Sequence, residues 1–399
     1  MKLLRLRLAL LAVALVLTLV GILFVHSTTS EGEPFPSRLA RGQMLKAAFA
    51  ILALFAVTRV DYRWVDRHAY AMYGVLASVL VAMLAVKLSS GGINRFIQLY
   101  IFQVQPSELM KIGLILGLAR YLRFREDQRQ VLGLVGPFAL TLVPMALVLL
   151  QPDLGTSLMF PPVLLGMLFA AGAKPRHLTL ALFLGLLLLP AAYFLGDRIP
   201  FIHQYQRARL TAFVRRDEAT ARSKGFRLRQ SEIAIGSGEL TGKGYGEGTQ
   251  NTLRYLPEKH TDFIFSIIAE GLGFVGAAGV VIFYVLLVAL TLRVAVYIRE
   301  PFGRLAVTGI GVAFAAQSFE NLGMTMGLTP ITGIPLPFVS LGGSSLLTSF
   351  LSLGIVLNIA SRPVRVVAPK DLDPKDRKKL LPLVEEKAAG LLENRWPVE

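Results

Sequence analysis

Charged side chains stand next to long apolar stretches at several points in the sequence. In LPEKHTDFIFSII, residues 256–268, Asp262 directly precedes an apolar run, and His260 lies two residues before it. An Asp in that position is common as a helix N-cap. A carboxylate held at a membrane surface can also act as a general base and accept a proton from a substrate hydroxyl. Both interpretations remain open at this point.

A second charged group occurs in QVQPSELMKIG, residues 103–113. Pro106 and Glu108 are typical of a helix start, because proline is tolerated in the first turn and an acid there faces the positive end of the helix dipole. Lys111 follows Glu108 by three residues, so both lie on one helix face. Ionisable residues at the edge of a membrane span cost free energy and indicate function. A plain helix start is the alternative.

Three more polar residues lie in connections between apolar runs. Arg95 occurs in GGINRFIQ and Asp153 in QPDLGTS, where turn chemistry alone also explains the proline, aspartate and glycine. Ser340 lies in the Pro- and Gly-rich stretch 327–342. That stretch cannot be regular helix, so we expect it to pack into protein or to line a cavity.

Two polar patterns accompany these connections. Gln317, Glu320 and Asn321 are spaced i, i+3, i+4 in an apolar stretch, so we expect this polar stripe to face the bundle interior. GSGELTGKGYGEGTQ, residues 236–250, is the glycine-rich segment. It has neither G-x-x-x-x-G-K-[ST] nor G-x-G-x-x-G spacing. It is therefore interpreted either as a flexible loop or as a backbone amide nest for a lipid diphosphate or sugar.

The elements that must position these residues are apolar. The 399 residues are 54% hydrophobic, with a mean hydropathy of +0.57. We predict an all-α polytopic membrane protein with about ten transmembrane helices, because long apolar stretches in such number exclude an ordinary soluble domain. The absence of cysteine excludes disulfides and thiol chemistry. The expected spans, including an uncleaved first one, are 8–25, 44–60, 69–88, 107–122, 132–150, 156–173, 177–195, 263–292, 304–326 and 343–361.

The net charge of +16 is explained by membrane topology. Lys and Arg gather in alternate short loops, so the positive-inside rule puts both termini in the cytoplasm, and no nucleic acid is expected as a partner. Residues 1–361 form the predicted membrane domain and 362–399 a charged cytoplasmic tail. Residues 196–262 form a large extracytoplasmic loop between helices 7 and 8, with an amphipathic helix near 201–214. The long eighth stretch is expected to be tilted or to form two pieces.

Five motifs, in this order, resemble the SEDS family of shape, elongation, division and sporulation proteins. They are QPSE, QPDLGTS, GSGELTGKGYGEGTQ, LPEKHTDFIFSIIAEGLGFVG and ITGIPLPFVSLGGSSLL. Within the family, GMTMGLTPITGIPLPFVSLGGSS is closer to the elongation member RodA than to the division member FtsW. The family usually has Tyr before the Gly pair, where this chain has Leu341 and therefore lacks that hydroxyl.

The resemblance implies a peptidoglycan glycosyltransferase of the bacterial inner membrane. Such enzymes polymerise lipid II, a disaccharide-pentapeptide on undecaprenyl diphosphate, into a nascent β-1,4 glycan strand. They usually work with a class B penicillin-binding protein, a transpeptidase that crosslinks the peptides. In the matching motifs, the family's essential aspartate is Asp262 and its functional glutamate is Glu108.

That reaction assigns a role to each charged residue. Inverting sugar transfer needs a carboxylate base, for which Asp262 is the hypothesis. Glu108 is the second residue expected to be catalytic, and its alternative roles are to tune Lys111, to bind a divalent cation or to position the acceptor. The leaving diphosphate needs positive charge rather than a proton. Either a divalent cation, Mg or Mn, supplies that charge, or side chains do, and the sequence leaves the choice open. The residues predicted to bind substrate are Arg95, Lys111, Asp153, His260, Arg207, Arg209 and Ser340.

Two other functions fit part of the sequence. A flippase that carries lipid II across the membrane would share a lipid groove and the polar stripe. It would also need charged groups in the middle of the membrane, whereas the charged groups here gather at the outer end of the predicted helical bundle. A non-catalytic scaffold would tolerate point mutations at that end.

Overall fold

The computed structural model describes residues 2–29, 34–90, 95–98, 103–125, 127–195, 225–252 and 260–362. The predicted amphipathic helix at 201–214, the cations Arg207 and Arg209, and the tail beyond Arg362 lie outside these residues.

Each of the ten predicted apolar stretches contains a helix. These helices are α1 (Lys2–Ser27), α2 (Arg38–Arg59), α3 (Tyr62–Ser90), α4 (Pro106–Leu122), α5 (Val131–Leu150), α6 (Leu154–Leu158) with α7 (Phe160–Ala170), α8 (Pro175–Leu195), α12 (Ile264–Tyr297), α13 (Pro301–Thr325) and α14 (Gly343–Ser361). Among the described residues, seven helices are long and apolar enough to cross a membrane. The chain is thus a polytopic helical membrane protein, as predicted; the number of ten spans stays a prediction.

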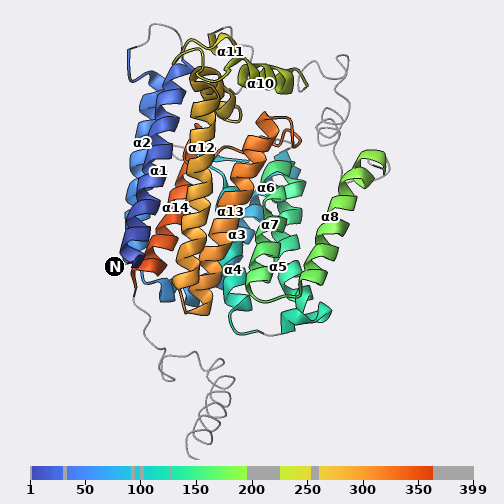
Figure 1. The fold of residues 1–399 in the computed structure, drawn as a ribbon. Helices are drawn as coiled ribbons and strands as arrows, with labels where there is room; N and C mark the ends of the chain where they lie inside the picture. The colour runs from blue at the N-terminus through green and yellow to red at the C-terminus, as the bar shows by residue number, and fades with distance from the viewer. Residues whose placement is uncertain are drawn as a thin grey trace, which may run out of the picture. The chain divides into compact units, whose positions relative to one another are not determined.

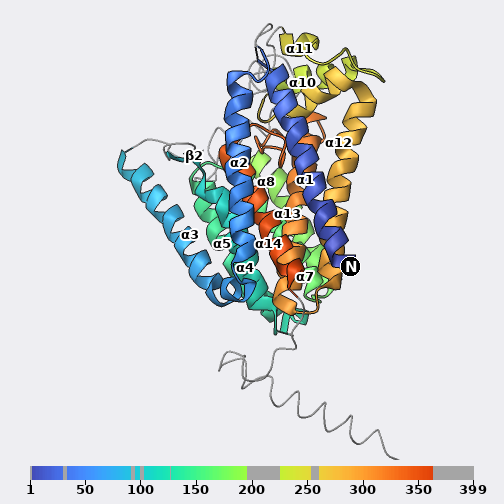
Figure 2. The ribbon, with the colours of Figure 1, turned by 90° about the vertical axis from the view of Figure 1, so that its left-hand side faces the viewer.

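The helices pack side by side into one bundle (Figures 1 and 2). The most extensive contacts join α2 to α14, α12 to α13 and α3 to α4. Two short helices, α10 (Gly225–Ser237) and α11 (Thr249–Thr252), lie over the end of the bundle at which α12 begins (Figure 1). A two-stranded antiparallel ribbon, β1 (Ile97–Gln98) with β2 (Gln103–Val104), precedes α4.

Small residues let α4 approach α3 closely. A Cβ atom at Gly113 would lie 2.8 Å from the side chain of Leu76, and one at Gly117 would lie 3.4 Å from the ring of Tyr73. Glycines one turn apart that face a neighbouring helix are typical of tight packing in membranes. The helix that carries Glu108 is therefore held firmly against α3.

The long helix α12 is broken near its start. Gly273 has φ 65° and ψ −164°, a conformation that glycine adopts readily and other residues rarely do. The amides of Phe274 and Val275, just after the break, donate to the carbonyls of Glu239 and Leu240 at 2.8 and 3.2 Å. The expectation that this stretch forms two pieces is confirmed.

The glycine-rich segment packs on this break. The amides of Lys243 and Gly244 donate to the carbonyls of Glu270 and Gly271 at 3.0 and 3.1 Å. The side chain of Glu270 is fully buried, lies 2.9 Å from the Lys243 ammonium and accepts from the amide of Gln250 at 3.0 Å. Three amides of this segment are thus bound to residues of α12, which favours a packed connection over a flexible loop.

This packing predicts a difference between two glycines with the same backbone conformation. Gly242 and Gly246 both have φ +82°, but a Cβ at Gly242 would lie 2.2 Å from the carbonyl oxygen of Gly271, whereas Gly246 has open space around it. Both alanine variants strain the backbone by about 1–2 kcal/mol. Gly242→Ala also forces the segment off α12, so it should lower the midpoint of thermal unfolding in detergent clearly more than Gly246→Ala. Equal midpoints would contradict the packing.

Candidate active site

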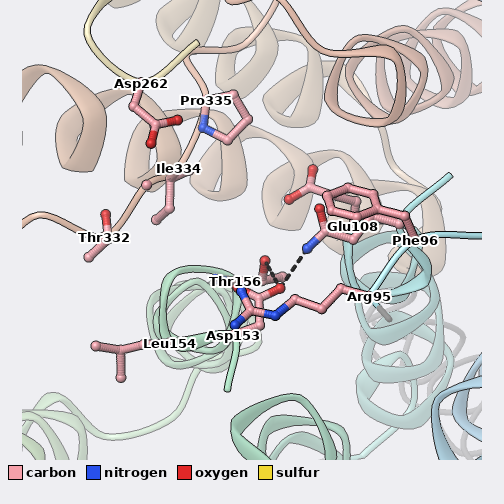
Figure 3. Close-up of a pocket in the computed structure, with 12 residues that line it drawn as sticks. Arg95, Phe96, Glu108, Asp153, Leu154, Thr156, Asp262, Thr332, Ile334 and Pro335 are labelled. Carbon is pink, nitrogen blue, oxygen red and sulfur yellow. Dashed lines mark hydrogen bonds between the residues drawn. The ribbon is translucent and has the colours of Figure 1, made fainter. Parts of the chain in front are cut away.

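A polar pocket lies near the starts of α4, α6 and α12, and Figure 3 shows the residues that line it. Its volume of about 160 Å³ is several times the roughly 30 Å³ that one water molecule takes up in the liquid. The residues that line it are Arg95, Phe96, Gln105, Glu108, Asp153, Leu154, Thr156, Asp262, Thr332, Gly333, Ile334 and Pro335. Four of the predicted site residues, Arg95, Glu108, Asp153 and Asp262, are therefore brought together.

Glu108 and Lys111 form a buried ion pair in the first turns of α4. Both side chains are 5% exposed, and the Lys111 ammonium lies 2.9 and 3.0 Å from the two Glu108 carboxylate oxygens. The ammonium also donates to Oε1 of Gln317 on α13 at 3.0 Å. Lys111 thus lies behind the pocket wall, where it neutralises Glu108 and joins α4 to α13.

Asp153 is the N-cap of α6. Its Oδ1 accepts from the amide of Thr156 at 3.2 Å, and its Oδ2 accepts from the hydroxyls of Thr156 and Ser107 and from Nε2 of Gln105 at 2.9, 3.1 and 2.6 Å. A cap of this kind satisfies an amide that the helix leaves without a partner. The turn interpretation therefore accounts for most of the bonding capacity of Asp153, although the residue also lines the pocket.

Asp262 lies across the pocket from Arg95 and Asp153 (Figure 3). The structure makes Phe263, rather than Asp262, the N-cap residue of α12, and Phe263 gives no side-chain capping bond. The Asp262 side chain lines the cavity and is partly exposed. Its backbone carbonyl accepts from Nδ2 of Asn321 at 3.0 Å. A carboxylate that faces a polar pocket while its backbone is held is suited to general-base work.

Arg95 is the one cation on the pocket wall among the described residues. It lies two residues before β1, and its Nε atom is buried without a hydrogen-bond partner there. Buried guanidinium groups are normally paired with anions. The orphaned Nε is therefore consistent with a site for an anionic ligand group.

Ser340 and His260 lie next to this site but are not among the residues that line it. The Ser340 hydroxyl donates to the carbonyl of Thr261 at 2.6 Å and accepts from the amide of Leu336 at 2.8 Å. The His260 carbonyl accepts from the amide of Leu341 at 2.9 Å. Both residues hold the segment before α12 against the 336–341 loop. The predicted Arg207 and Arg209 fall outside the described residues.

The polar stripe on α13 supplies contacts that spacing alone did not identify. Gln317 is 6% and Asn321 0% exposed, as expected for side chains that face the interior, whereas Glu320 is partly exposed. The Gln317 amide donates to the carbonyl of Pro335 at 2.9 Å, and the Asn321 amide donates to that of Ile334 at 2.7 Å. The expectation that the 327–342 stretch packs into protein and lines a cavity is confirmed.

The pocket residues do not make an evident site for a divalent cation. Within the described part of the chain, no group of three or more His, Asp or Glu side chains is arranged to hold a metal ion. Asp153 already accepts from four donors and Glu108 is paired with Lys111. A Mg or Mn ion, one of the two sources of positive charge that the sequence left open, is therefore not assigned to these residues.

Comparisons with known proteins find one family whose members match nearly the whole chain. The family model described as "Cell cycle protein", which carries the names FtsW, RodA and SpoVE, matches residues 2–363. The chain belongs to this family, the SEDS family. The resemblance inferred from the five motifs is thereby confirmed.

Relatives and solved structures in the family carry both member names. A probable peptidoglycan glycosyltransferase FtsW of Geobacter sulfurreducens is 36% identical, over 90% of this chain and 96% of the relative. The peptidoglycan glycosyltransferase MrdB of Escherichia coli is 35% identical, over 78% of this chain and 83% of the relative. A chain from a peptidoglycan synthase complex, solved in a study of polymerization and crosslinking, has 30% identity and a TM-score of 0.72, over 88% and 96%. Thermus thermophilus RodA has 29% identity and a TM-score of 0.63, over 88% and 95%.

The buried pair predicts a non-additive pattern of stability. Glu108→Gln leaves the Lys111 ammonium buried without its carboxylate, and removal of one partner of a buried pair costs about 3–5 kcal/mol. The double variant Glu108→Gln/Lys111→Met removes both charges and should recover much of that loss. A double-mutant cycle tests this with the unfolding midpoints in detergent of the wild type, Glu108→Gln, Lys111→Met and the double variant. Independent, additive effects would contradict a direct pair.

Proposed function

We propose that this protein is a peptidoglycan glycosyltransferase that polymerises lipid II at the described pocket, with Asp262 as the general base. The relatives named peptidoglycan glycosyltransferase support the activity. The observation that carries the mechanism is that a carboxylate, Asp262, and a cation, Arg95, line the same pocket from opposite sides.

The chemistry of the transfer matches these two groups. The 4-hydroxyl of GlcNAc on one substrate attacks the anomeric carbon of MurNAc on the other, and a new C–O bond forms. The bond from that carbon to the diphosphate breaks, and the electron pair leaves with undecaprenyl diphosphate. Asp262 takes the hydroxyl proton on the attacking side, opposite the leaving group, so the configuration inverts to β-1,4.

Arg95 is the proposed partner of the leaving diphosphate. A guanidinium can bind two phosphate oxygens at once and stabilise the charge that develops on them, and Nε of Arg95 is a donor without a partner among the described residues. Lys111, which the sequence also offers for this role, is bound to Glu108 and Gln317, and its contacts favour a role in holding Glu108. Arg207 and Arg209 remain proposed further cations, and Glu108 and Asp153 proposed contacts for the sugars.

The cellular role, the protein partner and the location are proposed from less specific observations. The motif GMTMGLTPITGIPLPFVSLGGSS supports elongation and rod-shape maintenance, while the relatives carry both the FtsW and the MrdB name. The match to a peptidoglycan synthase complex supports a class B penicillin-binding protein as partner. Loop charges support a location in the bacterial inner membrane with both termini in the cytoplasm, so that the pocket faces the extracytoplasmic lipid leaflet.

The proposal predicts that Asp262→Ala abolishes polymerisation. Loss of a general base lowers the rate by about 10²–10⁴-fold, which a gel assay of glycan products from purified protein and lipid II in detergent can measure. Asp127→Asn, a carboxylate change on an exposed residue paired with Arg125 away from the pocket, is the matched control and should stay active.

Two outcomes of this assay contradict the proposal. An Asp262→Ala protein that polymerises at the wild-type rate would exclude the base. If the wild-type protein and its transpeptidase partner together formed no polymer in detergent, while the protein moved lipid II across vesicle membranes, the flippase would be favoured. A parallel arm with a chelator reports whether a divalent cation takes part.

A further inference from the structure

The segment that carries Asp262 is fixed by three successive backbone carbonyls. The carbonyl of His260 accepts from the amide of Leu341 at 2.9 Å. The carbonyl of Thr261 accepts from the Ser340 hydroxyl at 2.6 Å. The carbonyl of Asp262 accepts from the Asn321 side chain at 3.0 Å. Each donor lies far along the chain from its acceptor, so tertiary structure, rather than the turn itself, sets this backbone.

Asn321 is the donor that binds the backbone of Asp262 itself. Its side chain is 0% exposed, and its two amide hydrogens match two acceptors, the carbonyls of Asp262 and Ile334 at 3.0 and 2.7 Å. Both carbonyls belong to non-helical backbone, and the side chains of both residues line the pocket. One amide thus ties the wall that carries Asp262 to the wall that carries Ile334.

We propose that Asn321 is a positioning residue for Asp262. Asn321 does not line the pocket; it acts by fixing the backbone from which the Asp262 carboxylate extends. The inference rests on the proposed function, because it assigns Asn321 to the alignment of the base. Alignment of this kind acts on the chemical step, and a misplacement of about 1 Å can cost about 10²-fold in rate.

The test compares two Asn321 variants with a neighbour on the same helix. Asn321→Asp keeps the size; in its ionised form it cannot donate to either carbonyl and repels both, and in its protonated form it can donate to only one of them. Asn321→Leu removes the donors without adding charge. Ser318→Ala is the matched control, because Ser318 is 4% exposed and its hydroxyl has no hydrogen-bond partner among the described residues.

The readout is kcat and KM for lipid II with the full chain in detergent, at a temperature below every unfolding midpoint and per amount of folded protein. Both Asn321 variants should lose about 10- to 100-fold in kcat, with KM within about twofold of wild type, because the interaction matters in the transition state. Ser318→Ala should keep both constants. If Asn321→Leu does not fold, Asn321→Asp alone decides.

The inference fails separately from the proposed function. If Asp262→Ala is inactive while Asn321→Asp keeps the wild-type kcat, or loses only in KM, Asn321 does not position the base. If Asp262→Ala is fully active, the base itself is wrong and the proposed mechanism falls with it.

Discussion

The pocket depends on one constraint: non-helical backbone within an apolar helical bundle needs a hydrogen-bond partner for each buried polar group. Residues 260–263 and 331–336 are both irregular and lie among buried helices. α13 meets the need with two side-chain amides one turn apart, which bind the carbonyls of Asp262, Ile334 and Pro335. These donors, together with the bonds from Ser340 and Leu341 to the carbonyls of Thr261 and His260, hold the two irregular segments together beside the cavity.

The same arrangement separates charges that stabilise from a charge that can react. Glu108 and Lys111 neutralise each other behind the wall, and Asp153 is bound by four donors. Buried charges that are paired in this way hold their surroundings in one geometry. Asp262 and Arg95 line the cavity on opposite sides. A substrate with a hydroxyl at one end of its reacting region and a diphosphate at the other is complementary to that separation.

Local sequence patterns predicted the helices and several of the residues that line the pocket. Apolar runs gave the spans, the i, i+3 spacing predicted that Glu108 and Lys111 share a face, and loop charges predicted that Arg95, Glu108, Asp153 and Asp262 meet at one end. The sequence could not predict the hydrogen bond from Asn321 to the Asp262 carbonyl. It also could not predict that the glycine-rich segment packs on the α12 break. Both contacts join residues far apart in the chain through irregular backbone, which has no period in the sequence. Ser340 was expected to touch substrate, whereas its hydroxyl holds Thr261.

The most direct measurement is a structure of the Asp262→Asn variant with lipid II bound in the pocket. The account predicts the side chain at residue 262 within about 2.6–3.2 Å, or one bridging water, of the GlcNAc 4-hydroxyl of the acceptor. It also predicts the Arg95 guanidinium on the diphosphate of the donor. Sugars bound in another cleft, or a 4-hydroxyl directed away from residue 262, would contradict it.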